Sequence, residues 1–248
     1  MQPSNKVERV LRQAMDTFYG PADGFQDRLT ALTTVLNGLV ASDVGLDARL
    51  LHSDMYQLDA EDAENFAGPS VAAAVRRRQT PVTYINVYED RLMAASVFVL
   101  RDRARIPLHD HPHMHGLMKV LAGRIRVQSF NTQQLDCNRT RVTHVGAEKL
   151  APVIMGPDDY TNVLRPQHGN IHQVETVDGP AAIFDLLVPP YDTCAPETGP
   201  RRCRFFKEMH TSKGLQLTVV SQHKGYWNDV APYKGPSISL YSNQQNAI

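Results

Sequence analysis

Four histidines at alternating positions give the sequence its most distinctive chemistry. They occupy the segment Ile106-Pro-Leu-His-Asp-His-Pro-His-Met-His-Gly116 and are His109, His111, His113 and His115. Side chains two residues apart on a β-strand point to the same face, so His109 and His111 can direct two imidazoles at one metal ion. Such a pair on one face of a strand favours a specific metal site over a histidine-rich surface tract. Pro112 cannot donate to a strand ladder, so we expect the strand to end or bulge there, with His113 and His115 in a loop or around the ligands.

A second pair of histidines lies further along the chain, in Arg165-Pro-Gln-His-Gly-Asn-Ile-His-Gln173. Gly169–Asn170 predicts a turn, and the apolar residues around His172 predict a buried strand immediately after it. His172 is therefore the better candidate for a third ligand. His168, inside the turn, is more typical of a polar loop residue.

Three neutral imidazoles would leave a divalent ion with its full positive charge. Many non-haem iron oxygenases use two histidines and one carboxylate and keep open positions for substrate and oxygen. In a three-histidine site an anionic substrate such as a thiolate could supply the missing negative charge, and oxygen could then oxidise its sulfur to a sulfinic acid. Zinc would fit the same ligands, so the histidines alone do not select iron.

The elements that must position these histidines change character along the chain. Apolar residues at three- and four-residue spacing predict helices over 7–18 and 25–40, whereas the stretch from His52 to Gln79 fits no single pattern. From Pro81, short runs rich in valine, isoleucine and aromatic residues predict strands, with no helix between them. The predicted strands are Thr83–Tyr88, Ala94–Leu100, Leu117–Leu121, Arg124–Phe130, Arg141–Lys149, Tyr160–Leu164, His172–Val177, Ala181–Val188 and Leu215–Val220.

This organisation is typical of a mainly β sandwich or closed barrel. We expect residues 1–80 to form a helical flank packed on the barrel. Residues 81–248 would form the barrel domain, with a tail rich in proline and glycine beyond Pro189.

Composition excludes several classes of protein. Lysine plus arginine (26) balances aspartate plus glutamate (26), which argues against nucleic-acid binding. The longest apolar run, Met93–Leu100, is too short to cross a membrane and suits a buried strand. Three cysteines without a CxxC pair indicate a reducing compartment, so we expect a cytoplasmic protein, and the neutral charge and single domain make a monomer the simplest expectation.

The motifs taken together resemble a known family. Ile106 to Gly123 is similar to the first cupin motif, although Gly116 occupies the position where many cupins have a metal-binding glutamate. In order along the chain, the motifs from about Pro81 to Tyr191 resemble those of the cysteamine (2-aminoethanethiol) dioxygenase and plant cysteine oxidase family of cupin thiol dioxygenases. They include Asn170-Ile-His-Gln173, Gly179-Pro-Ala-Ala182 and Pro189-Pro-Tyr-Asp192. The resemblance implies a cupin-type double-stranded β-helix, or jelly-roll, barrel.

The same resemblance implies a function and a set of site residues. It implies an iron(II) enzyme that uses O2 to convert cysteamine, or the N-terminal cysteine of a protein, to the sulfinic acid, and a role in oxygen sensing through the N-degron pathway. The implied iron ligands are His109, His111 and His172. Asp185, within the apolar run Ile183-Phe-Asp-Leu-Leu187, would hold the substrate ammonium, and a carboxylate there is costly unless it is paired. His168 and Tyr191 match family positions with supporting roles.

One departure from the family concerns Cys203. Some animal members have a tyrosine two residues after this cysteine, and the two side chains can become crosslinked near the iron. This chain has Phe205 at that position, so we expect no such crosslink, nor any hydrogen bond from that position to oxygen.

Three alternatives remain open on the sequence. A free-cysteine dioxygenase would need a cation for the substrate carboxylate, and Arg126 and Arg141 lie on predicted strands. A cupin isomerase would share the metal site. A non-catalytic, ligand-binding cupin would hold zinc or no metal and consume no oxygen.

Overall fold

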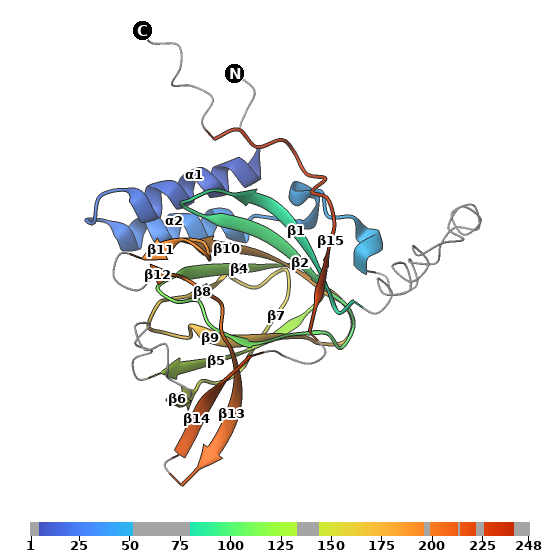
Figure 1. Ribbon diagram of the computed structural model, residues 1–248. Coiled ribbons are helices and arrows are strands. Elements are labelled where there is room, and N and C mark those ends of the chain that lie inside the picture. The colour runs from blue at the N-terminus through green and yellow to red at the C-terminus, as the bar shows by residue number, and fades with distance from the viewer. Residues whose placement is uncertain are drawn as a thin grey trace, which may run out of the picture.

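Two β-sheets face each other and form a barrel, with a helical layer on the outside of one sheet (Figure 1). The computed structural model describes residues 5–51, 80–132, 144–195, 199–212, 214–221 and 226–240. The first sheet has the order β15 (Asn228–Val230), β1 (Val82–Glu89), β2 (Ala94–Leu100), β10 (Ala181–Val188), β4 (His115–Ala122), β8 (Asn162–Leu164). The second has the order β6 (His144–Lys149), β14 (Gly214–Val220), β13 (Phe205–Thr211), β3 (Arg105–His109), β9 (Ile171–Thr176), β5 (Ile125–Thr132), β7 (Val153–Met155). A small separate ladder joins β11 (Cys194–Ala195) to β12 (Gly199–Pro200).

The chain crosses repeatedly from one sheet to the other. Strands β2, β3, β4 and β5 alternate between the two sheets, and β8, β9 and β10 alternate again. This winding is that of a double-stranded β-helix, so the predicted jelly-roll barrel is confirmed.

Strand β10 has apolar side chains on both faces. Ala182, Phe184 and Leu186 pack with the helices in one core cluster, whereas Ala181 and Ile183 pack inside the barrel in another. Both faces of this sheet are therefore buried, which explains the unbroken apolar run that predicted the strand. Because side chains alternate along a strand, Asp185 shares the inward face of Ile183.

The helical layer contains α1 (Lys6–Tyr19) and α2 (Phe25–Asn37), followed by the 3-10 turns η1 (Ala41–Val44) and η2 (Ala48–Leu51). The second helix is three residues shorter than predicted, because it ends at Asn37 with Gly38 as its C-cap. The C-terminal segment runs over α1 (Figure 1) and is attached there, since the Ser239 amide donates to Glu8. Neither helix of the described part is long and apolar enough to span a membrane. The ambiguous stretch from His52 to Gln79 lies outside the described residues.

Several strands differ from the prediction. The strand expected to carry both His109 and His111 is β3, and it ends at His109. Strands β7 and β15 were not predicted, because three residues each are too few to show a period. Strand β13 carries lysine, glutamate and histidine on its exposed positions, and with β14 it projects from the barrel as a hairpin (Figure 1). Predicted strand Tyr160–Leu164 begins later, at Asn162, and residues 141–143 of another lie outside the described part.

Candidate metal centre and substrate pocket

Three histidines meet inside the barrel at the end of β3. His109 is the last residue of β3 and pairs across the ladder with His172 on β9. The strand ends there, so His111 lies beyond it rather than on it, yet the Nε2 atoms of His109 and His111 are only 3.1 Å apart. The ligand atoms of all three side chains lie within 4.8 Å of one another.

Hydrogen bonds at Nδ1 orient all three rings so that Nε2 is the nitrogen that can bind a metal. Nδ1 of His109 lies 2.8 Å from the carbonyl oxygen of Pro107, and Nδ1 of His172 lies 3.2 Å from that of Asn170. A carbonyl only accepts, so each Nδ1 must carry the proton and each Nε2 keeps its lone pair.

Tyr191 fixes the third ring in the same way. Its hydroxyl donates to the Asp110 carbonyl at 2.6 Å, so its oxygen accepts from Nδ1 of His111 at 2.8 Å. Tyr191 is therefore the hydrogen-bond partner that selects the ligand tautomer of His111, a role that its sequence position alone did not specify.

Burial keeps the three imidazoles neutral. It lowers the pKa of His109 to about 4 and that of His172 to about 3, and it lowers the pKa of His111 well below its usual value. Each ring is therefore neutral at neutral pH, with its proton on Nδ1 and a free lone pair on Nε2, which is the form that binds metal.

The donor set fits a divalent metal ion. Two nitrogens that bind one ion at right angles and about 2.1 Å each lie about 3.0 Å apart, close to the 3.1 Å between the Nε2 atoms of His109 and His111. Among the described residues, no carboxylate joins this cluster. A metal held here would carry three neutral protein ligands and keep open positions.

Two further residues support the ligands. Asn170 was not assigned a role from the sequence, whereas Asp110, between two of the ligands, was expected either around the ligands or on the surface. The side chain of Asn170 accepts from the His111 amide at 2.9 Å and donates to the His111 carbonyl at 2.8 Å. Asp110 is buried rather than exposed, and it pairs with Arg204 at 2.7 Å. These contacts tie the turn that carries His111 to β9 and to the start of β13.

Replacing Asn170 with alanine should therefore loosen the metal centre. We expect metal affinity to fall about 10- to 100-fold, as is usual when an outer partner of a ligand is lost. Metal content after dialysis against a graded chelator measures this, with Asn86→Ala, an exposed asparagine of β1, as the matched control. Equal metal retention by both variants would contradict a positioning role for Asn170.

A pocket of about 120 Å³ opens beside the histidines. Its walls are mostly apolar and include Phe98, Ile106, Met118 and Ile183, while Asp185 supplies a carboxylate. No lysine or arginine lines it among the residues that the structure describes. Arg126, one candidate for a carboxylate partner, instead pairs with Glu175 at 3.1 Å and is half exposed, and Arg141 lies outside the described residues.

Asp185 is an isolated acid in this pocket. It is partly buried, and no described lysine, arginine or histidine pairs with it within 4.0 Å. Burial raises its pKa to about 7, so its charged form is costly without a partner. The pocket is therefore suited to a ligand that brings its own positive charge.

The other residues singled out from the sequence lie in several places. Tyr191, Cys203 and Phe205 line the pocket. His168 is exposed in its turn, where its backbone bonds to Arg165, and it does not line the pocket. His113 is exposed in the turn, while His115 packs on α1 and α2 through Phe18 and Phe25.

Comparison with known proteins shows the family to which the chain belongs. A family model described as PCO_ADO matches residues 35–238. The chain belongs to this family. The 2-aminoethanethiol dioxygenases of Homo sapiens and Mus musculus are 31% and 29% identical to it, each over 94% of this chain and 96% of the relative.

More distant relatives and solved structures complete the comparison. Plant cysteine oxidase 1 of Arabidopsis thaliana is 25% identical over 84% of this chain and 65% of the relative. The structure of KdgF from Halomonas sp. has a TM-score of 0.33 at 17% identity, over 45% of this chain and 82% of that one. A cupin superfamily protein from Desulfitobacterium hafniense has a TM-score of 0.33 at 14% identity, over 48% of this chain and 88% of that one.

Proposed function

We propose that this protein is an iron(II)-dependent thiol dioxygenase that converts cysteamine, the N-terminal cysteine of proteins, or both, to the sulfinic acid with O2. The observation that carries the proposal is the pairing of a carboxylate-free three-histidine centre with Asp185 in a pocket without a described cation. Membership of the PCO_ADO family and the names of its dioxygenase and oxidase relatives support the same chemistry.

The roles of the residues follow from charge. His109, His111 and His172 would hold Fe(II), which supplies Lewis acidity toward the thiol and redox chemistry with O2. Asp185 would bind the substrate ammonium, which both cysteamine and a polypeptide N-terminus possess. The apolar wall excludes water from this ion pair and so strengthens it.

This charge pattern disfavours a free-cysteine dioxygenase. Free cysteine carries a carboxylate as well as an ammonium, and the carboxylate would meet Asp185 without a described cation to bind it. The other two alternatives, an isomerase and a non-catalytic ligand-binding cupin, have no specific observation in their favour.

A comparison of kcat/KM between substrates tests the proposed role of Asp185. We expect kcat/KM for cysteamine, or for a peptide that begins with cysteine, to exceed that for free cysteine by at least about tenfold, since an unpaired buried charge costs more than 1.4 kcal/mol. Sulfinic acid formation by the iron-loaded protein is the measurement. Preferred turnover of free cysteine would contradict the role of Asp185 and favour the free-cysteine alternative.

The cellular role that we propose follows from the reaction and from the composition of the chain. Because O2 is a reactant, turnover can report oxygen concentration, and oxidation of protein N-termini would connect the enzyme to the N-degron pathway. We propose a cytoplasmic monomer that acts without nucleic acid or membrane partners, as the neutral composition suggests.

A further inference from the structure

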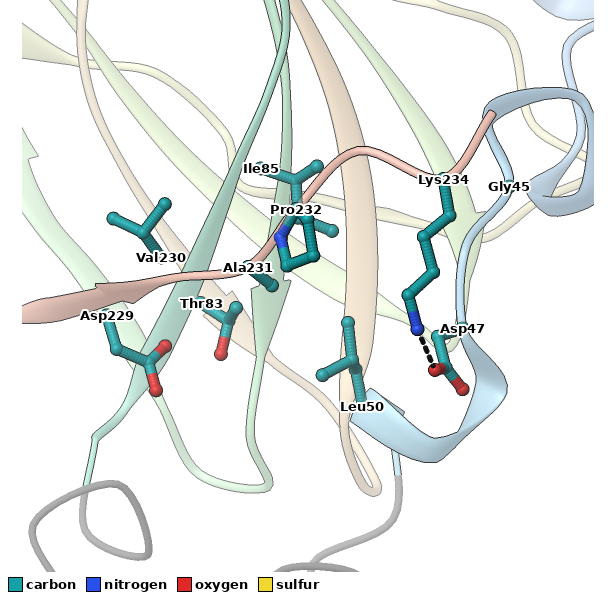
Figure 2. Close-up of a pocket in the computed structure, with 10 residues that line it drawn as sticks. All are labelled: Gly45, Asp47, Leu50, Thr83, Ile85, Asp229, Val230, Ala231, Pro232 and Lys234. Carbon is teal, nitrogen blue, oxygen red and sulfur yellow. Dashed lines mark hydrogen bonds and ion pairs between the residues drawn. The ribbon is translucent and has the colours of Figure 1, made fainter. Parts of the chain in front are cut away.

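A second pocket lies where β1, β15, the turn before η2 and the C-terminal segment meet (Figure 2). Its volume is about 200 Å³. It is separated from the metal centre by the edge of the first sheet: Tyr84 of β1 contacts Phe98, which lines the metal pocket, whereas its neighbours Thr83 and Ile85 line the second pocket. Since successive side chains of a strand alternate, the two cavities lie on opposite faces of β1.

The two carboxylates of this pocket differ in whether they have hydrogen-bond partners. Asp47 accepts hydrogen bonds from Arg49 and from Lys234, the latter at 2.9 Å and visible in Figure 2. Asp229, on β15, has no such partner: its Oδ1 is buried without a hydrogen bond, and it forms no ion pair with a described residue. A buried carboxylate oxygen without a donor is costly. Asp229 is therefore the carboxylate of this pocket that no described cation neutralises.

The rest of the pocket is suited to a slender apolar group. Leu50, Ile85 and Pro232 form its walls between Asp229 and the Asp47–Lys234 ion pair (Figure 2). Lys234 is already paired with Asp47, so its repulsion of a second cation is reduced. The complementary ligand is a single ammonium group on an aliphatic stem, which is the shape and charge of a lysine side chain.

The two pockets are joined by a short segment of chain. Tyr226 lines the metal pocket and Asp229 lines the second pocket. Three residues of extended chain reach at most about 11 Å. Asp229 lies on β15, the edge strand of the first sheet, so a polypeptide that leaves the metal pocket past Tyr226 would pass around this edge to reach Asp229.

We propose that the second pocket binds a lysine side chain near the N-terminus of the polypeptide substrate, with Asp229 as the partner of its ammonium group. The binding itself stands on the pocket, while the connection to the substrate rests on the proposed function. Cysteamine has no residue that could reach Asp229, so the pocket would distinguish polypeptide from small aminothiol substrates.

Tryptophan fluorescence can measure this binding without catalysis. Trp227 is the single tryptophan of the chain and lies two residues before Asp229. The full-length protein would be titrated with short peptides that begin with alanine and carry lysine at each later position in turn, and with the same peptides carrying norleucine, which has the stem without the charge. We expect saturable binding of at least one lysine peptide, and binding at least about tenfold weaker for its norleucine counterpart.

Variants and a free amine complete the test. Asp229→Asn should remove the preference for lysine, whereas Asp178→Asn, at an exposed aspartate on another turn, should retain it. Equal affinity for lysine and norleucine peptides, or an unchanged preference in Asp229→Asn, would overturn the proposal. Binding of n-butylammonium with no advantage for any lysine peptide would also overturn it, since the pocket would then take free amines.

Kinetics separate this inference from the proposed activity. With peptides that begin with cysteine, lysine at the preferred position should lower KM several-fold in the wild type and not in Asp229→Asn. Turnover of cysteamine should be the same in both proteins, and an equal loss for cysteamine would contradict a site specific to polypeptides. If no thiol is oxidised at all, the proposed function fails while the fluorescence titration still decides whether the pocket binds lysine.

Discussion

The His172→Ala variant is expected to lose both its iron and its activity. His172 supplies one of three buried ring nitrogens that lie within 4.8 Å of one another, and no carboxylate of the described chain joins them. Two remaining histidines cannot complete the centre, so iron affinity should fall by more than the 10- to 100-fold typical of losing an outer partner. Iron content of the purified protein and the rate of sulfinic acid formation measure the two effects.

His168→Ala is the matched control for this variant. His168 lies four residues earlier in the same segment, but it is exposed and does not line the pocket. We expect its replacement by alanine to leave iron content and activity near wild-type levels. Full iron retention in His172→Ala, or equal losses in the two variants, would show that the metal ligands have been misassigned.

Asp185→Asn is expected to lose activity while gaining stability. Asparagine keeps the shape of the side chain but cannot form an ion pair with the substrate ammonium. We therefore expect kcat/KM for cysteamine to fall about 100-fold, within the range for losing one partner of a buried charge pair. Most of the loss should appear in KM, because the ammonium is bound in the ground state as well as in the transition state.

The gain in stability of Asp185→Asn over the wild type should increase as the pH rises. Burial raises the pKa of Asp185 to about 7, above the ordinary value of an unfolded aspartate. The folded metal-free protein therefore favours the neutral form, and the cost of the charged form appears as pH rises from about 4 and is complete above about 7. Asp185→Asn lacks this cost, so the excess of its melting temperature over the wild type should grow between pH 5 and pH 8.

The expected size of this gain is about 5–10 °C between pH 5 and pH 7, because each pH unit contributes about 1.4 kcal/mol and 1 kcal/mol corresponds to about 2–4 °C for a domain of this length. Melting curves of the metal-free proteins across that pH range measure it. Asp178→Asn, at an exposed aspartate, should show no such trend. A lower melting temperature for Asp185→Asn at every pH would indicate a structural ion pair instead.

The sequence predicted the elements whose apolar pattern is strong. The runs that became β2 and β10 were predicted to the residue, because a sheet buried on both faces requires continuous apolar sequence. Strand β3 was expected from its histidines rather than from an apolar pattern, and its end was placed too late, because the strand stops at His109 and His111 lies beyond it. The helix over 25–40 was predicted too long because apolar residues continue past Gly38, where the helix ends.

The site was predictable in part. His109, His111 and His172, expected from residue type and spacing, are brought together, and Asp185, implied by the family resemblance, faces the same pocket. The contacts of Asn170 and Asp110 were not predictable, because each depends on a partner far away in the sequence, His111 and Arg204 respectively. The second pocket could not be predicted from the sequence for the same reason, since its two carboxylates lie near opposite ends of the chain.

The most direct test of the proposed function is the mass of the product. The iron(II)-loaded protein would be incubated with a peptide that begins with cysteine, once under ordinary oxygen and once under 18O2. We predict a gain of about 32 Da in the first case and about 36 Da in the second, since both oxygen atoms of the sulfinic acid would come from O2. No gain on this peptide, on cysteamine or on free cysteine would contradict the thiol dioxygenase assignment and leave a metal-binding barrel with a different chemistry.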